Sequence, residues 1–211
     1  MSSRDAAISG LPLARSAVAR TRDVLRELID FRVRSLPVPV GVLRNFDKVW
    51  AHFKQPVMPI DTFGLFPRVT TLQELLTSID SVYQGIADTL ADANANAIFR
   101  DPSESVFGPR TKAFVLRGPR VAGEPPPGPL WPDSIYFAAG FADLGPLKRA
   151  EITVHECAHW QNNQLIQDNA QPGFENYQKM DAGLALLNAW SYSQFALDCA
   201  FGRALPFADN E

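Results

Sequence analysis

Apolar residues recur at helical spacing through the first part of the chain. Between Ala14 and Arg34, valines, leucines and an isoleucine repeat at close to the 3.6-residue period, with arginines between them. This pattern predicts an amphipathic helix, which Pro37 and Pro39 would end. A second, shorter helix is expected from Phe46 to Phe53.

A third helix is predicted over residues 71–90, where the apolar positions again follow helical spacing. Thr71 and Glu74 stand at the spacing of a capping box, which marks the start of a helix. Residues 54–68 contain three prolines and a glycine and are expected to form a connection. Residues 1–100 are therefore predicted to be a mainly helical N-terminal part.

The pattern changes in the proline-rich region 101–134, which is expected to be largely a surface loop. Two short apolar runs, Lys112–Leu116 and Ser134–Phe137, are β-capable and predict a pair of strands. Beyond them, an apolar stretch from Tyr177 to about Phe201 predicts one buried helix. The expected fold class is mainly α with a small β-sheet or hairpin (α+β), in a single domain over 1–211 with residues 135–211 as its third part.

Composition narrows the class of protein. The 211 residues are 46% hydrophobic, which is enough for one domain with a real core. The net charge is −3, so the basic excess typical of a nucleic-acid partner is missing. No apolar run reaches the length of a membrane span, and two cysteines are too few for a disulfide framework. The N-terminus has no recognisable signal peptide, so the expected location is the cytoplasm or export by a signal-independent route.

The strongest chemical signal is the run His155-Glu156-Cys157-Ala158-His159, which is an H-E-x-x-H motif. Helical spacing places the two histidines on one face, one turn apart, where both imidazoles can bind one zinc ion. Glu156 adjoins the first of these ligands and is the candidate general base. Cys157 falls on the apolar side of the same helix, so we expect it to be a small buried hydrophobe.

A catalytic zinc ion needs a third protein ligand. No histidine follows the motif, so the candidates are the acidic residues downstream of it: Asp168, Glu175, Asp181 and Asp198. Asp181 stands near the spacing of the third ligand in thermolysin-like peptidases but has the shorter acidic side chain. Spacing alone leaves these candidates open.

The order of HECAHW (155–160), then Asp168, then the segment 187–196 resembles the aspzincins, the family of deuterolysin and the peptidyl-Lys metalloendopeptidases. The strands at 112–116 and 134–137 and the helix 71–90 also resemble the family's elements, so the match covers most of the chain. The resemblance implies a zincin-like peptidase domain with one zinc ion per chain, held by His155, His159 and Asp168, and a peptide or protein substrate.

The same resemblance implies roles for residues outside the zinc motif. In the family, a tyrosine three residues after the aspartate helps hold the oxyanion; here that position is Gln171, and Tyr177 or Tyr192 is expected to substitute unless the role is missing. We take Tyr192 as the catalytic candidate. The substrate-pocket wall is expected to include Asn188, Trp190 and Ser193, and the uncharged Trp190 favours an apolar rather than a lysine substrate residue.

Departures from the family leave two other functions open. The family's cysteines near the positions of Arg100 and Phe137 are absent, and its Thr-Asp-Asp run is replaced by Ile166-Gln167-Asp168. The first alternative is a catalytically silent zinc-binding or interaction module on a zincin fold. The second is a thermolysin-like peptidase with Asp181 as the third ligand.

Overall fold

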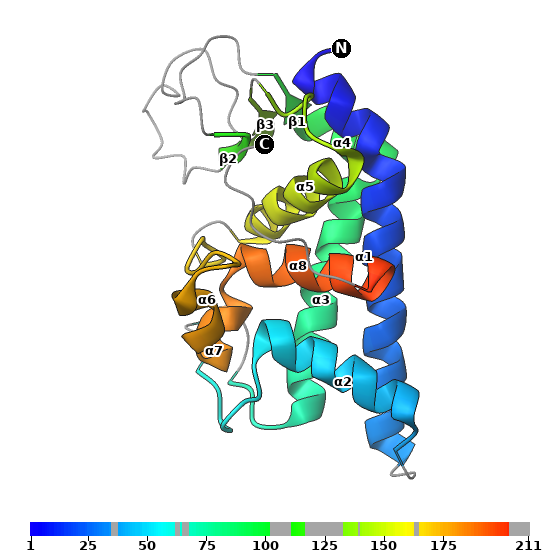
Figure 1. Cartoon of the computed structure of the whole chain (residues 1–211), viewed down its shortest axis with the longest axis vertical. Coiled ribbons are helices and arrows are strands. Elements are labelled where there is room, and N and C mark those ends of the chain that lie inside the picture. The colour runs from blue at the N-terminus through cyan, green and yellow to red at the C-terminus, as the bar shows by residue number, and fades with distance from the viewer. Residues whose placement is uncertain are drawn as a thin grey trace.

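The computed structural model describes residues 1–34, 38–61, 64, 68–101, 111–116, 133–138, 140–162 and 165–202. Helix α1 (Ser3–Arg34) runs along the length of the molecule and packs against α3 (Leu72–Leu90), α5 (Pro146–Gln161) and α8 (Ala189–Phe201) (Figure 1). Helix α2 (Val40–Phe53) packs against α8 at the end away from the sheet. Most of the proline-rich region 101–134 lies outside the described residues.

The predicted helices of the N-terminal part are present, and two of them are longer than predicted. Helix α1 begins at Ser3 rather than Ala14 because its buried stripe continues backwards through the small side chains of Ala6 and Ala7 and through Leu11. Helix α2 begins at Val40 rather than Phe46. Alanine contributes little to a hydrophobic pattern, which is why the sequence did not reveal the first turns of α1.

Helix α3 begins where its capping box predicts. The Thr71 side chain accepts a hydrogen bond from the Glu74 backbone N–H, and the Glu74 carboxylate accepts one from the Thr71 backbone N–H. These bonds satisfy backbone donors that the first turn of a helix leaves unpaired. The short helix α4 (Asp92–Ile98) follows and was not predicted.

A three-stranded sheet lies near the N-terminus of α1 (Figure 1). The predicted pairing is confirmed: β2 (Ala113–Leu116) and β3 (Ser134–Phe137) are antiparallel, with Phe114 opposite Tyr136. The unpredicted strand β1 (Phe99–Arg100) pairs with β3 in parallel. Because the strand order is β1-β3-β2, β2 forms one edge of the described sheet.

The predicted single helix from Tyr177 to Phe201 is wrong, because the structure divides it into α6 (Glu175–Lys179), α7 (Ala182–Leu186) and α8 (Ala189–Phe201). The Asp181 side chain caps α7 by accepting from the Leu184 N–H. Asn188, between α7 and α8, forms a parallel β-bridge with Gln167. A β-bridge requires extended backbone, so the chain cannot stay helical there.

Most of these elements share one buried core, which draws residues from α1 at Ala6 to α8 at Cys199. Cys157 and Cys199 are free and buried, and Cys157 belongs to this core as expected. None of the helices in the described ranges is long and apolar enough to cross a membrane. The architecture is mainly α with a small sheet, which confirms the predicted fold class.

Candidate metal centre

Helix α5 carries the H-E-x-x-H motif in the middle of the molecule. Pro146 occupies the first turn, where its missing N–H costs nothing. Ala150, Val154 and Cys157 are fully buried and anchor the helix in the core. The two histidines lie on another face, so the core contacts fix their orientation without using their rings.

The rings of His155 and His159 converge on one carboxylate. His155 Nε2 lies 3.1 Å from His159 Nε2 and 3.1 Å from Asp168 Oδ1. The third edge, from His159 Nε2 to Asp168 Oδ1, is 3.4 Å. Residues from α5 and from the loop after it therefore form a compact cluster of two nitrogen ligands and one oxygen ligand.

The size of this cluster fits a tetrahedral zinc ion. Zinc–nitrogen and zinc–oxygen bonds of about 2.0–2.1 Å at tetrahedral angles place neighbouring ligand atoms about 3.3 Å apart. The three edges of the cluster are 3.1, 3.1 and 3.4 Å. Two imidazoles and one carboxylate are also the ligand types that catalytic zinc sites use.

A hydrogen bond from the backbone sets the tautomer of His159. Its Nδ1 lies 2.8 Å from the Ile166 carbonyl oxygen. A carbonyl oxygen can only accept, so Nδ1 carries the proton, and in the neutral ring Nε2 keeps its lone pair facing the cluster. Such an outer contact is what usually orients a metal-binding histidine.

The loop that carries Asp168 is held by the connection between α7 and α8. The Gln167 N–H donates to the Leu187 carbonyl at 2.8 Å, and the Ala189 N–H donates to the Gln167 carbonyl at 3.0 Å. The Asn188 side chain accepts from the Ala170 N–H at 3.3 Å. Bonds on both sides of Asp168 therefore fix its position although its side chain is 49% exposed.

Burial and charge act in opposite directions on the cluster. Burial alone would raise the pKa of Asp168, but its hydrogen bonds to both histidines outweigh this and hold the pKa well below its usual value. Burial lowers the pKa of His155 despite the nearby aspartate. Burial also raises the pKa of Glu156 to about 8, a shift that His159 partly opposes. A cation bound to the cluster would favour the ionised form of Glu156.

The other acidic candidates are engaged elsewhere. Glu175 is exposed and pairs with Lys179 in the same helix. Asp181 caps α7. Asp198 lies 3.9 Å from Lys48 and 3.4 Å from His52 through its carboxylate oxygens. Among the described residues, Asp168 is the acidic side chain that the fold brings to the two histidines.

Of the three predicted substrate-binding residues, Trp190 lies beside the cluster. Its ring centroid is 4.1 Å from that of His155. The structure corrects the prediction for Asn188 and Ser193, whose side chains are fully buried. Asn188 supports the Asp168 loop, and the Ser193 hydroxyl donates to the Trp190 carbonyl inside α8. Because α8 is buried on nearly all sides, few of its residues reach solvent.

The predicted catalytic role of Tyr192 is corrected by its packing. Its ring lies among Phe53, Tyr83 and Phe195, and its hydroxyl donates to the Leu186 carbonyl at 2.9 Å. Tyr177, the other candidate, places its hydroxyl 3.1 Å from His52 Nδ1. Both phenol groups are thus committed to contacts away from the metal ligands.

The sequence analysis missed two polar groups near the site. Lys148 and Glu151 form an ion pair on α5, and Gln194 of α8 donates to the Glu151 carboxylate. Their spacing from His155 could have revealed that they share its helix face. His52, with Tyr177 and Asp198, forms the second group, which brings together three elements far apart in the sequence.

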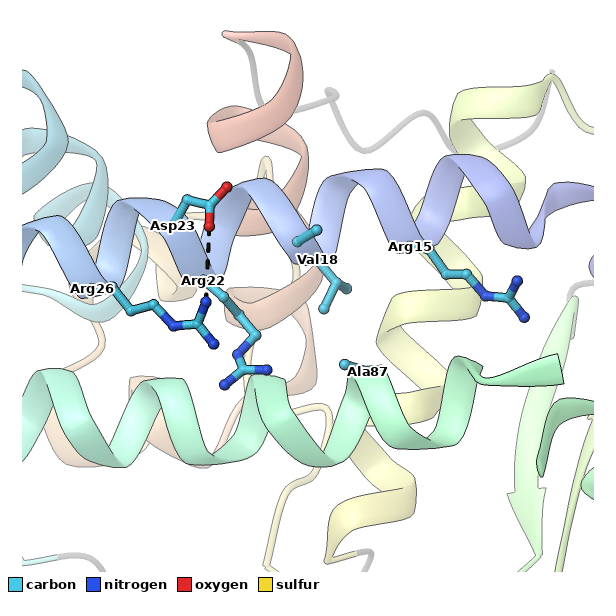
Figure 2. A pocket seen from close by; sticks show the side chains of 7 residues that line it. Arg15, Val18, Arg22, Asp23, Arg26 and Ala87 are labelled. Atoms are coloured by element: carbon cyan, nitrogen blue, oxygen red, sulfur yellow. Dashed lines mark ion pairs between the residues drawn. The ribbon is translucent and has the colours of Figure 1, made fainter. Parts of the chain in front are cut away.

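A separate shallow cavity of about 290 Å³ lies between α1 and α3 (Figure 2). Three arginines of α1 line it, and each pairs with an aspartate: Arg15 with Asp92, Arg22 with Asp80, and Arg26 with Asp23. None of the metal-cluster residues lines this cavity. Its arginines are neutralised, so it does not alter the interpretation of the site.

Comparison with known proteins supports the fold. No protein-family profile matches the sequence, and no curated protein matches it. Among solved structures, the chain is similar to a zinc peptidase from Grifola frondosa, with a TM-score of 0.58 and 14% identity over 92% of this chain and 94% of that one. At this identity the likeness shows a shared fold: the chain has the fold of a zinc peptidase.

Proposed function

We propose that this protein is a zinc-dependent metalloendopeptidase. The observation that carries the proposal is the cluster of His155, His159 and Asp168, whose ligand atoms are spaced like three corners of a zinc tetrahedron. The cluster lies in an H-E-x-x-H helix, in a chain that shares its fold with a zinc peptidase. The spacing, the motif and the fold are independent observations that support the same function.

The residues of the cluster divide the work between them. His155, His159 and Asp168 would bind the metal, which would supply Lewis acidity by lowering the pKa of water and polarising the scissile carbonyl. Glu156 would accept a proton from the attacking water and deliver it to the leaving amine. Its buried setting favours this role, because a carboxylate that is not fully stabilised as an anion takes up a proton readily.

Strand β2 is a candidate contact for the substrate backbone. It lies at an edge of the described sheet and contacts α5. An extended peptide can add to such an edge through backbone hydrogen bonds. This arrangement would lay the substrate along the helix that carries the motif.

The alternative of a silent zinc-binding module draws on one observation. The hydroxyl groups of Tyr177 and Tyr192 are both bonded elsewhere, so neither tyrosine faces the cluster as an oxyanion donor. Such a donor contributes up to about a thousandfold to acyl-transfer rates. The silent module would bind zinc in the same way but hydrolyse nothing.

Casein hydrolysis distinguishes the two functions. We expect the zinc-loaded protein to cleave casein, to stop after treatment with a chelator, and to recover when zinc is restored. His155→Ala is the matched control, since it removes one ligand from an exposed turn of the site and should cleave nothing. Cleavage that persists in the chelator or in this variant would contradict a zinc peptidase, and zinc binding without cleavage would favour the silent module.

A further inference from the structure

Lys148 and Glu151 continue the stripe of α5 that carries the metal ligands. Lys148 precedes His155 by about two helical turns and Glu151 precedes it by about one. Residues at these separations share a helix face. The stripe therefore runs from the metal cluster toward the N-terminus of α5.

The Lys148 ammonium group is turned into this face and away from water. Its Nζ lies 2.8 Å from Glu151 Oε2 and 5.5 Å from the centroid of the Trp190 ring. Gln194 donates to the other oxygen of the Glu151 carboxylate. The Lys148 side chain is 21% exposed whereas that of Glu151 is 0% exposed, so the lysine covers the carboxylate.

Trp190 connects this ion pair to the metal cluster. Its ring contacts the His155 ring at 4.1 Å between centroids and also lies beneath the Lys148 ammonium. Lys148, Trp190 and His155 therefore form a continuous line of contacts. A side chain placed at the ion pair would lie next to the first metal ligand.

A buried carboxylate in this setting needs a cation. Burial raises the pKa of Glu151, and Lys148 followed by Gln194 opposes this rise. Without a partner, an ionised carboxylate at such a site costs several kcal/mol. Lys148 supplies the cation from within the chain, and its covalent attachment gives it a high effective concentration over any free cation.

We propose that Glu151, Gln194 and Trp190 form a subsite for an alkylammonium group, and that Lys148 fills this subsite and so determines which substrate residues the enzyme accepts. Lysine and arginine of a substrate meet an ammonium group already in place and a carboxylate already neutralised, so they are excluded. Uncharged side chains, packed on Trp190, are accepted. This consequence for cleavage rests on the proposed function, whereas the subsite itself does not.

The subsite is tested by emptying it. Lys148→Ala removes the side chain beyond Cβ, which leaves a space with the length and charge of n-propylammonium. We expect n-propylammonium chloride at about 100 mM to raise the Tm of this variant by about 3 °C over sodium chloride at equal ionic strength. The wild type and the double variant Lys148→Ala/Glu151→Gln should show no such rise. An equal rise in all three proteins, or none in a folded Lys148→Ala, would overturn the subsite.

A peptide-library digest gives a second measurement that needs no folded variant. With both new termini identified by mass spectrometry, the zinc-loaded wild type should deplete lysine and arginine next to the cut at least tenfold relative to their abundance in the library. Lys148→Ala should recover them at least tenfold, and Lys148→Met, which fills the space without charge, should not. Lysine or arginine dominating the wild-type termini would overturn the proposal even if Lys148→Ala does not fold.

The two measurements separate this inference from the proposed function. If n-propylammonium stabilises Lys148→Ala but the zinc-loaded wild type cleaves nothing, the subsite stands and the peptidase function fails. If the wild type cleaves freely beside lysine and arginine, the function stands and the subsite fails.

Discussion

Gln167 and Asn188 pair their backbones in a parallel β-bridge that holds the third candidate ligand against the two histidines. The bridge joins the loop after α5 to the connection between α7 and α8. Asp168 directly follows Gln167 and places its carboxylate 3.1 Å from His155 Nε2. The site therefore depends on a contact between segments that are distant in the sequence.

Asn188 should influence zinc binding without touching the metal. Its side chain accepts from the Ala170 N–H and donates to the Ser191 hydroxyl, both at 3.3 Å. Asn188→Ala removes the support on one side of Asp168, so we expect zinc affinity to fall by about tenfold, as for other outer contacts of metal ligands. Competition with a chromophoric chelator measures the affinity. Affinity equal to that of the wild type would mean that the bridge alone positions the loop.

Asp168 and Asp181 should respond very differently to the same substitution. Asp168→Asn replaces a charged ligand of the cluster, so zinc affinity should fall by more than the roughly 100-fold that an outer contact can explain. Asp181→Asn is the matched control, because Asp181 caps α7 and the asparagine still caps well. Zinc content and affinity of the two variants decide the ligand. Zinc loss in Asp181→Asn with retention in Asp168→Asn would point to a thermolysin-like site.

The sequence was sufficient for the parts of the site that lie within one helix. His155, Glu156 and His159 follow from the period of α5, and the capping box placed the start of α3 correctly. Asp168 could be named only through the family resemblance, because its approach to the histidines depends on a non-local bridge. The break between α7 and α8 was missed for the same reason, since apolar periodicity continues through a residue whose backbone pairs elsewhere.

Tyr192 shows the opposite difficulty, because a residue can have the right chemistry and the wrong surroundings. Its buried hydroxyl donates to the Leu186 carbonyl, and burial raises its pKa. We expect Tyr192→Phe to reduce stability by about 1–2 kcal/mol, because the carbonyl loses its partner, and to leave kcat within about twofold of the wild type. Denaturant unfolding and peptidase assays measure the two effects. A loss of activity with unchanged stability would restore Tyr192 to the catalytic group.

His52 should make stability depend on pH. Burial lowers its pKa, although Asp198 opposes this, while Lys54 and Lys48 act with burial; Tyr177 also contacts the ring. The unfolded chain therefore binds a proton near pH 6.5 that the folded protein does not, so stability falls as the pH drops below that value.

His52→Gln keeps a donor and an acceptor but cannot ionise, which makes it the suitable comparison. The difference in unfolding free energy between wild type and variant should shrink from about pH 7.5 to about pH 5.5, by about 1.4 kcal/mol for each unit by which the pKa is lowered. Urea unfolding of the chelated proteins at both pH values measures it. A difference that grows toward acidic pH would mean that His52 is protonated in the folded protein.

The central claim is that the cluster on α5 hydrolyses peptide bonds with Glu156 as the base, and Glu156→Gln tests it most directly. Glu156 is buried beside a ligand and is not itself part of the ligand cluster, so the isosteric amide should leave zinc binding intact. The measurement is the rate of peptide hydrolysis by wild type and variant at equal, verified zinc content. We predict a fall of about 100- to 10,000-fold in the variant. Hydrolysis by zinc-loaded Glu156→Gln at the wild-type rate would contradict the account.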